Sequence, residues 1–269
     1  MTLAPKPPRI LSIAGSDSSG GAGIQADIKT ITMLGGYAMT AITAITAQNT
    51  LGVQGVAGIA PDMVLAQIAS CVEDIGVDTV KIGMLADEDV IRHVAAAMVL
   101  LRPPIVLDPV MIATSGAVLV GPDALAALRA RLFPLATLIT PNLPELEHLA
   151  GRPLDTVEAM IVAAQELAAA SGAAVLAKGG HAEGETITDV LIVPGEAPLF
   201  YEHARIITRH THGTGCTLSS AIATLLGRGE SLPEAVRLAR EFVLSAIEVA
   251  PGYGAGSGPL GHQAVRESE

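Results

Sequence analysis

The sequence predicts an α/β fold, with a mostly parallel central sheet and helices on both of its faces. Short apolar runs alternate along the chain with longer amphipathic stretches, and the runs occupy residues 9–14, 38–44, 79–82, 105–107, 137–139 and 173–176. Nearly continuous apolar runs are typical of strands that are covered on both faces. Because strand and helix alternate, we expect parallel strands that are joined by helical crossovers.

Two of the expected helices have recognisable starts. Residues 156–170 carry apolar side chains at helical spacing, and Asp155 with Glu158 is a candidate capping pair. Residues 232–249 follow Ser231, which stands three positions before Glu234 in the same relation. Both segments are long enough to cover a sheet.

The composition indicates a compact domain that binds small molecules. Of the 269 residues, 50% are hydrophobic and 16% are charged, which favours a single domain over residues 1–269 with a flexible N-terminus over residues 1–8. Aromatic residues make up only 2% and the formal net charge is −11. We therefore expect no nucleic-acid partner, because stacking residues are scarce and an acidic protein repels phosphate backbones.

Cysteine usage and hydropathy indicate the cytoplasm. The two cysteines, Cys71 and Cys216, lack the spacing of a metal site or of a disulfide framework. The N-terminus has no signal-peptide core, and Arg102 and Asp108 interrupt the longest apolar stretch. We therefore expect a cytoplasmic protein that does not use a membrane.

Four polar or glycine positions fall just after predicted strands: Gly15, Asp108, Asn142 and Lys178. In open α/β sheets, ligands bind beyond the carboxyl ends of the strands. We therefore expect these four positions to converge on one site.

The stretch THGTGC, residues 211–216, places glycines directly before a predicted helix. Glycines let backbone amides approach a ligand closely, and a helix N-terminus presents unpaired N–H groups with the positive end of its dipole. Such a turn suits a transferred phosphoryl group. A tight turn that only packs the helix against the sheet explains the pattern equally well.

The loop GSDSSGGAGIQAD, residues 15–27, imitates a dinucleotide fingerprint through Gly21, Gly23 and Ala26. The context does not fit, because these glycines lie several residues beyond the strand and the next strand ends without an acidic ribose partner. A polar loop that folds over a substrate fits better. The P-loop pattern GxxxxGK[ST] is absent from the sequence.

Polar residues at the later strand ends allow two interpretations each. Asn142 and Glu145 stand three apart at a helix start, which suits either a hydrated Mg²⁺ or a capping box. Asp108 is either a turn residue or a metal neighbour, and Lys178 is either a phosphate ligand or an exposed strand end. His210 and His212 lack a third metal ligand and are better explained as a solvated or hydrogen-bonded pair.

Two further features stay open on the sequence alone. Met84 and Met111 follow strands, where methionines either clamp a flat ring or belong to the core. The glycine-rich segment from Pro251, PGYGAGSGPLGH, predicts a flexible C-terminus when it is taken by itself.

Seven segments resemble a known family in a fixed order along nearly the whole chain, from Ile10 to His262. They are AGSDSSGGAGIQADIKT, ITAQNT, KIGMLA, LDPVM, ITPNLPE, KGGH and THGTGCTLSSAIA. Together they resemble the hydroxymethylpyrimidine and phosphohydroxymethylpyrimidine kinases of thiamine synthesis, in the ribokinase-like superfamily. The glycine-rich C-terminal segment is similar to the ending of that family.

The resemblance implies an ATP- and Mg²⁺-dependent kinase. It phosphorylates the hydroxymethyl group of 4-amino-5-hydroxymethyl-2-methylpyrimidine, and a second transfer then gives the pyrophosphate. Gln48 is implied to hydrogen-bond the aminopyrimidine. The other implied site residues are Gly15, Asp27, Met84 and Val110 around the substrate, Lys178, Thr211 and Asn142 at the ATP phosphates, Glu145 and Asp108 at the metal, and the backbone amides of Gly213, Thr214, Gly215 and Cys216 as an anion hole.

Cys216 stands where many ribokinase-like enzymes carry an aspartate base, and the pyrimidine kinase branch resembles the cysteine form. We hypothesise that a neutral thiol suits the second transfer, because the phosphate nucleophile already carries about −1.5 to −2 charges. At a helix start the pKa of the thiol is expected to fall, which would let it act as base in the first transfer.

Two alternatives remain on the sequence alone. A pyridoxal kinase is the nearest, although Gln48 favours the aminopyrimidine and no second cysteine stands within residues 111–121. A ligand-binding homologue without catalysis is the other, and the intact THGTGC and NLPE segments argue against it. The family resemblance also implies a homodimer.

Overall fold

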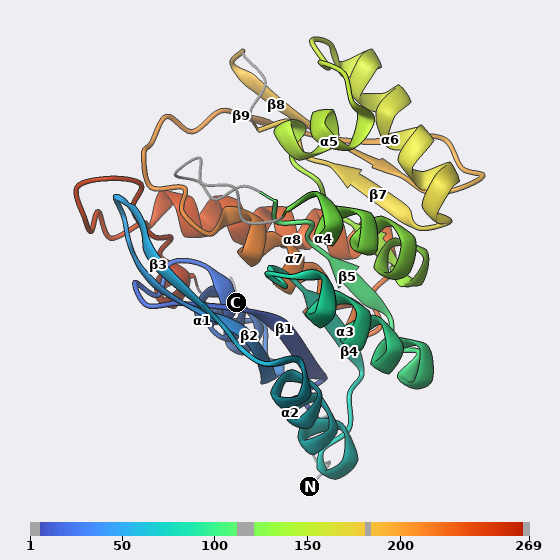
Figure 1. Cartoon of the computed structure of the whole chain (residues 1–269). Coiled ribbons are helices and arrows are strands. Elements are labelled where there is room, and N and C mark those ends of the chain that lie inside the picture. Colours follow the sequence, from blue (N-terminus) through green and yellow to red (C-terminus); the bar gives the residue numbers. More distant parts are fainter. Residues whose placement is uncertain (1–5, 112–120, 181–183, 266–269) are drawn as a thin grey trace, which may run out of the picture.

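The computed structural model describes residues 6–111, 121–180 and 184–265. Through this part of the chain runs one nine-stranded sheet, in the order β3-β2-β1-β4-β5-β6-β7-β8-β9 (Figure 1). The strands are β1 (Arg9–Asp17), β2 (Tyr37–Asn49), β3 (Gly52–Gly58), β4 (Thr79–Ile82), β5 (Ile105–Leu107), β6 (Leu138–Ile139), β7 (Ala174–Ala177), β8 (Thr186–Ile192) and β9 (Leu199–Ala204). The helices are α1 (Gly23–Met33), α2 (Pro61–Asp74), α3 (Glu88–Leu101), α4 (Pro122–Ala127), α5 (Leu143–Ala150), α6 (Val157–Ser171), α7 (Thr214–Gly227) and α8 (Leu232–Glu248).

The predicted fold class is confirmed. All strand pairs from β2 to β7 are parallel, and β3, β8 and β9 extend the two edges in antiparallel fashion. Each of the six predicted apolar runs forms one of the parallel strands. β1 and β2 are longer than their apolar runs, and their extensions carry Asp17 and Gln48 into the region beyond the sheet.

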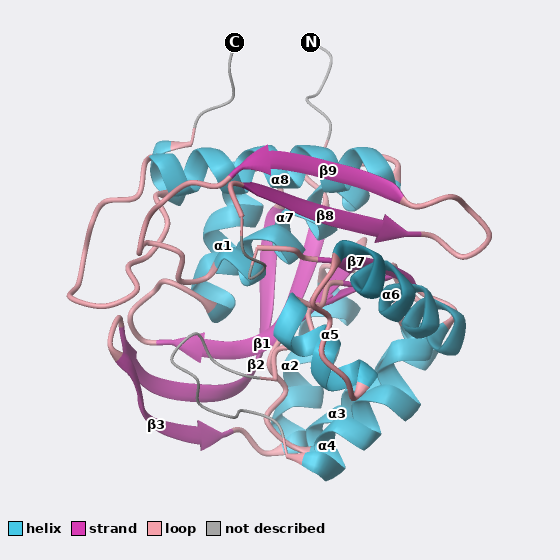
Figure 2. Ribbon diagram, turned by 90° about the horizontal axis from the view of Figure 1, so that it is seen from above, coloured by secondary structure: helices cyan, strands magenta, loops and turns pink. Residues whose placement is uncertain are grey.

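Helices cover both faces of the sheet (Figure 2). Along the central strands, successive side chains point to opposite faces, so Leu11 packs in the core with α2, α3 and α4, whereas Ile10 packs with α1, α7 and α8. A third cluster lies between β7, β8 and helices α5 and α6. The central strands are thus buried on both sides, which explains why their runs are apolar throughout.

The structure differs from the prediction in the capping residues of two helices. The N-cap of α6 is Thr156, whose hydroxyl accepts a hydrogen bond from the Ala159 amide at 3.1 Å, so the Asp155 and Glu158 pair was the wrong cap. Ser231 precedes α8 as predicted, but its side chain makes no capping hydrogen bond.

The C-terminal segment up to Val265 is packed, so the prediction of a flexible C-terminus was wrong for these residues. The amide of Ser257 donates to the Thr50 carbonyl at 2.9 Å, and that of His212 donates to the Gly258 carbonyl at 3.1 Å. A Cβ on Gly256 would lie 2.0 Å from the Thr50 oxygen, so only glycine permits this approach. At the other end, residues 1–5 of the predicted flexible N-terminus lie outside the described residues.

Among the described helices, none has both the length and the apolarity that crossing a bilayer requires.

Candidate active site

A cavity of about 760 Å³ opens where the carboxyl ends of the parallel strands meet. Its walls come from the segments that follow β1, β5, β6 and β7, from the end of β2, and from the turn before α7. A volume of this size accommodates a drug-sized ligand or more. The convergence that was predicted from the strand-end residues is therefore present.

The structure brings nearly all of the predicted site residues together around this cavity. Those that line it are Gly15, Gln48, Met84, Asp108, Val110, Asn142, Glu145, Lys178, Thr211, Gly213, Thr214, Gly215 and Cys216.

Asp27 is the exception, and its predicted place in the substrate pocket was wrong. Its side chain is fully buried on the inner side of α1, where it accepts hydrogen bonds from Lys81 at 2.9 Å and from the Ser12 hydroxyl at 2.6 Å. The sequence places Asp27 at the end of a loop motif, but the helix turns it away from the cavity toward β1 and β4.

The turn before α7 is compatible with both interpretations of THGTGC, a tight packing turn and a phosphate-binding turn. Gly213 has a φ of 88°, and a Cβ there would lie 1.9 Å from the Gly21 carbonyl oxygen. The turn therefore packs tightly against the loop after β1. It also begins α7 at Thr214, and residues 213–216 line the cavity. The start of a helix presents amides that lack partners in a preceding turn, which suits an anion.

An ion pair lies beside this turn. Lys178 Nζ is 3.0 Å from Asp108 Oδ1, which also accepts a hydrogen bond from the Thr140 hydroxyl. A Cβ on Gly215 would lie 3.2 Å from Asp108 Oδ2 and 3.4 Å from Lys178 Nζ. Burial acts to lower the pKa of Lys178, but Asp108 and Glu145 outweigh it and raise that pKa. The ammonium is thus neither exposed nor neutral, and it adjoins the turn before α7.

Asn142 and Glu145 form the capping box that was one of the two interpretations. The Asn142 side chain accepts from the Glu145 amide at 2.9 Å, and the Glu145 carboxylate accepts from the Asn142 amide at 2.8 Å. Both residues also line the cavity. Burial raises the pKa of Glu145 to about 7, and the carboxylate of Asp108 contributes to the rise.

The Glu145 and Asp108 carboxylates fit a magnesium ion. Their mutual repulsion contributes to the raised pKa of Glu145, and a dication between them would relieve it. Within the described residues, no group of three or more Asp, Glu, His or Cys side chains is arranged as a metal site. Mg²⁺ keeps several waters and takes few protein ligands, so two carboxylates are sufficient.

Cys216 lies in the first turn of α7, where a lowered pKa was expected. That expectation was wrong: burial raises the pKa of Cys216 to about 11, with Lys81 lowering it and the carboxylates of Asp27 and Asp108 raising it. The helix start does not offset these effects, and the thiol is neutral at physiological pH in the ligand-free site.

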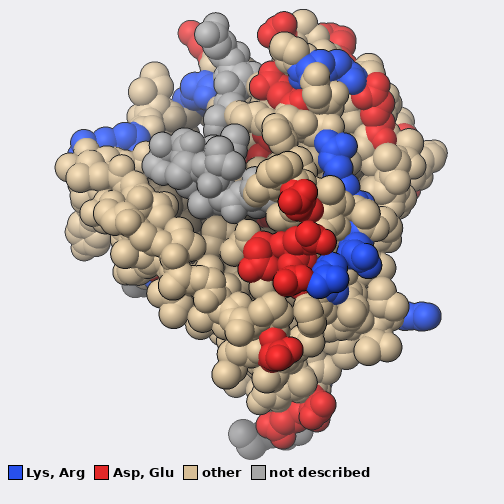
Figure 3. Space-filling view, viewed as in Figure 1, with Lys and Arg blue, Asp and Glu red and all other residues tan. Residues whose placement is uncertain are grey.

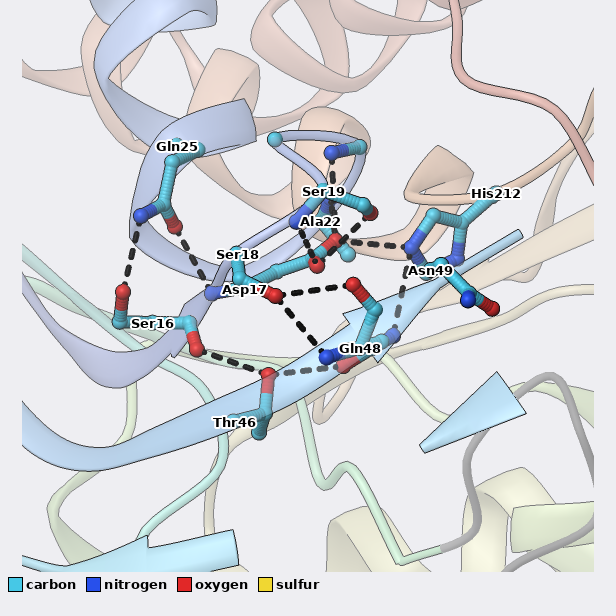
Figure 4. A network of polar contacts seen from close by, with 12 residues as sticks. Ser16, Asp17, Ser18, Ser19, Ala22, Gln25, Thr46, Gln48, Asn49 and His212 are labelled. Atoms are coloured by element: carbon cyan, nitrogen blue, oxygen red, sulfur yellow. Dashed lines mark hydrogen bonds and ion pairs between the residues drawn. The ribbon is translucent and has the colours of Figure 1, made fainter. Parts of the chain in front are cut away.

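Gln48 and His212 belong to one polar network (Figure 4). His212 Nε2 lies 2.8 Å from Asp17 Oδ2 and 3.4 Å from Gln48 Nε2. Asp17 in turn accepts from the amides of Ser19 and Ala22, which fixes the loop after β1. His212 is therefore a hydrogen-bonded, buried residue that joins three segments of the cavity wall, as one interpretation of the histidine pair predicted.

Of the two methionines, Met84 lies in the cavity wall and Met111 lies in the hydrophobic core. Met84 lines the cavity next to Gly15. A Cβ added to Gly15 would lie 2.5 Å from the methyl carbon of Met84. Met111 is 3% exposed and belongs to the core beneath the sheet.

Two charged features of the cavity were not predicted. Lys81 lines it from the middle of β4, and its signal is a lone charge within the apolar run TVKI. Arg240 also lines the cavity, and it donates to Asp189 Oδ2 at 2.8 Å and bonds His203 Nδ1 at 2.6 Å. Arg240 lies within an amphipathic helix where nothing in the sequence distinguishes a buried arginine from a surface one.

Comparison with known proteins agrees with this geometry. The model of the phosphomethylpyrimidine kinase family matches residues 17–261. A hydroxymethylpyrimidine/phosphomethylpyrimidine kinase of Streptomyces coelicolor is 44% identical over 256 residues, which cover 95% of this chain and 94% of the relative. The thiamine biosynthesis bifunctional protein ThiED of Geobacter sulfurreducens is 46% identical, and this chain spans 52% of its length.

A solved structure with the same fold is the ADP complex of Bacillus subtilis pyridoxal kinase. It has a TM-score of 0.88 and 40% identity, and the match covers 96% of this chain and 98% of that one. With the long family match and the curated relatives, this similarity places the chain in the phosphomethylpyrimidine kinase family.

Proposed function

We propose that this protein transfers phosphoryl groups from ATP to 4-amino-5-hydroxymethyl-2-methylpyrimidine and then to its monophosphate. The observation that carries the proposal is the arrangement around one cavity. The start of α7 and the Asp108–Lys178 pair line the same cavity as the Gln48 amide. An anion site made of the α7 amides and the Lys178 ammonium would therefore lie beside a hydrogen-bonding group for a polar ring. An anion site beside a site for a polar ring is what a small-molecule kinase requires.

The pyrimidine binds next to the loop after β1. The Gln48 amide hydrogen-bonds the aminopyrimidine edge, since its side chain carries both a donor and an acceptor. Gly15 has no side chain to fill the space beside Met84, and Met84 and Val110 form the apolar wall around the ring. This places the hydroxymethyl group toward Cys216 and the turn of residues 213–216.

The phosphates bind at the strand ends and at the start of α7. The amides of Gly213 to Cys216 stabilise the transferred phosphoryl group, and Lys178, with Thr211 and Asn142 nearby, binds the ATP phosphates. Glu145 and Asp108 would hold Mg²⁺, which would neutralise phosphate charge when bound. In the transfer the hydroxymethyl oxygen bonds to the γ-phosphorus, the bridging P–O bond breaks, and ADP leaves.

Cys216 faces the nucleophile in both transfers. Its neutral thiol adds no repulsion to the phosphate nucleophile of the second transfer, which needs little deprotonation. For the first transfer the thiolate would accept the hydroxyl proton, and its small population at pH 7 limits that step.

The test is ATP consumption by the purified protein with magnesium, offering in turn the pyrimidine alcohol, its monophosphate and pyridoxal, and separating the products by charge. Turnover of both pyrimidines is expected. Turnover of neither, with tight binding of the alcohol, would replace the proposal by a non-catalytic ligand-binding homologue.

Pyridoxal is the second candidate substrate. Besides the Bacillus subtilis enzyme, a Staphylococcus aureus pyridoxal kinase in complex with AMP-PCP and pyridoxal has a TM-score of 0.88 at 32% identity, covering 96% of this chain and 94% of that one. Gln48 favours the aminopyrimidine, so we expect pyridoxal to be the poorer substrate. Turnover of pyridoxal alone would reverse the assignment.

A homodimer is part of the proposal, through the outer face of β2 and β3. Ile45 is 51% exposed, and Ala57, which lies opposite it on β3 and shares its face, is exposed as well. Few charged side chains lie over this region, unlike the helices (Figure 3). Sedimentation should give twice the chain mass of 27.4 kDa. Lysine at Ile45 and Ala57 should give monomers, whereas lysine at Leu100, a helix residue that is 84% exposed, should not.

The proposal also includes the domain organisation and the cellular location of the protein. Residues 1–269 act as one kinase domain, which the continuous sheet supports. Both cysteines are free thiols, which supports a cytoplasmic location.

A further inference from the structure

The carboxylate of Asp17 requires a hydrogen-bond donor at His212. Its oxygens accept hydrogen bonds from the backbone amides of Ser19 and Ala22 and from the Ser19 hydroxyl, each at 2.8 Å. Burial acts to raise the pKa of Asp17, but these hydrogen bonds and the one with His212 outweigh it and lower that pKa. The carboxylate is therefore ionised and can only accept, so His212 Nε2, at 2.8 Å, carries a hydrogen and donates it.

The His212 ring is held firmly in place. The residue is 6% exposed, and its backbone amide donates to the Gly258 carbonyl at 3.1 Å. A Cβ on Gly21 would lie 2.4 Å from Cδ2 of the ring, so the loop after β1 packs directly against it. The Nε2–H group therefore has a fixed position in the cavity wall.

The hydrogen on Nε2 decides how the side-chain amide of Gln48 is turned. The two ends of such an amide have nearly the same shape, and their hydrogen-bond partners determine which end is which. With the amide nitrogen 3.4 Å from His212 Nε2 (Figure 4), two donors face each other. With the amide oxygen in that place, the oxygen accepts a second, weaker share of the Nε2 hydrogen.

Thr46, at the other end of the amide, requires the same orientation. Its hydroxyl has a single hydrogen, and it lies 3.0 Å from the Ser16 carbonyl and 3.1 Å from the Gln48 amide. A carbonyl can only accept. Both contacts are therefore hydrogen bonds only if the hydroxyl donates to Ser16 and accepts from the amide nitrogen of Gln48.

We propose that His212 is a positioning residue that determines specificity, because it holds the Gln48 amide with its oxygen toward His212 and its nitrogen toward Thr46. The inference rests on the proposed binding of a pyrimidine at Gln48. The oxygen keeps one free lone pair and the nitrogen keeps one free hydrogen. A ligand edge therefore has to present a donor on the His212 side and an acceptor on the Thr46 side.

This order of donor and acceptor distinguishes two rings of the same shape. The 4-amino group of the pyrimidine is the donor, and the neighbouring ring nitrogen is the acceptor. The 4-oxo analogue, the product of deamination, has a carbonyl and a ring N–H in the opposite order. An amide that turns freely would bind both rings, whereas a fixed amide leaves the 4-oxo ring with unpaired groups and so rejects it.

The test measures the binding of both rings by titration calorimetry in the absence of ATP. The unsubstituted protein should bind the 4-oxo analogue roughly tenfold or more weakly than the 4-amino compound, since buried groups that stay unpaired are costly. In His212→Leu, which has no hydrogen to donate, the ratio should fall to roughly twofold or less, because the amide can then turn to suit either ring. His212→Gln should retain the ratio, since Asp17 attracts the nitrogen of the new amide and its second hydrogen faces Gln48.

A second measurement covers the case in which His212→Leu does not fold. In the ligand-free protein, nuclear Overhauser effects from the Gln48 side-chain NH₂ group, assigned by its loss in Gln48→Glu, should reach the Thr46 side chain and not the His212 ring. Effects to the His212 ring instead would overturn the proposal, and so would an unchanged ratio in folded His212→Leu. If neither ring binds while the effects reach Thr46, the amide is oriented as proposed and the assigned substrate is wrong.

Discussion

Replacing Gly213 by alanine should separate two contributions to the stability of the site. A residue with a side chain at a φ of 88° costs about 1–2 kcal/mol. In addition, the new Cβ would lie 1.9 Å from the Gly21 carbonyl oxygen, so backbone must move, and such overpacking costs about 1–3 kcal/mol. The sum is about 2–5 kcal/mol. For a domain of this size, each kcal/mol lowers Tm by roughly 2–4 °C.

Gly35→Ala is the matched control. Gly35 has a φ of 72° but meets nothing within 4 Å of an added Cβ, so it pays only the conformational cost of about 1–2 kcal/mol. Thermal melts of both variants, in the absence of ligand, give the contribution of the contact between the turn and the loop after β1. Turnover should fall in Gly213→Ala and persist in Gly35→Ala. Equal Tm values for the two variants would refute the claim that the turn and the loop are locked together.

Three further predictions concern charges around the cavity. Glu145 has a folded-state pKa of about 7 against an ordinary value near 4.3, so it costs stability as pH rises through that window. Glu145→Gln should therefore raise Tm at pH 8 but not at pH 4 in ligand-free melts, while reducing magnesium-dependent turnover; a gain at pH 4 alone would contradict the sign. Cys216→Asp should slow the monophosphate transfer more than the alcohol transfer, and steady-state kinetics showing an unimpaired second transfer would remove the charge argument. Lys178→Met should raise KM for ATP about 10- to 100-fold, since hydrogen bonds to charged groups contribute about 1.5–3 kcal/mol, and an unchanged KM would place the phosphates elsewhere.

The parallel strands could be predicted because burial on both faces leaves a continuous apolar run. The edge strands could not, because β3 reads GVQGVAG and is mostly exposed, and its glycines resemble a loop. A strand with no buried face has no period or apolarity that distinguishes it from its surroundings.

The site residues also fall into those that the sequence predicts and those that it does not. Residues directly after strands were predicted to converge and do so, because the carboxyl ends of parallel strands share one edge. Asp27 was misplaced, since spacing along α1 does not distinguish a side chain that faces a cavity from one that faces the strands below it. The pKa of Cys216 was also misjudged, because a helix start is visible in sequence and burial among carboxylates is not.

The interlocked loops around the cavity have a consequence for how the chain folds. The hydrogen bond from His212 to Asp17 joins residues 195 positions apart, and the one from Gly256 to Thr50 spans 206 positions. Contacts of such sequence separation form late, because a long loop must close before they contribute. During synthesis, the N-terminal strands therefore emerge well before the segments that complete the pocket. A nascent chain that ends before residue 212 has its substrate loop without its anchor, and catalytic competence arises only when the segment from residue 212 onward has docked.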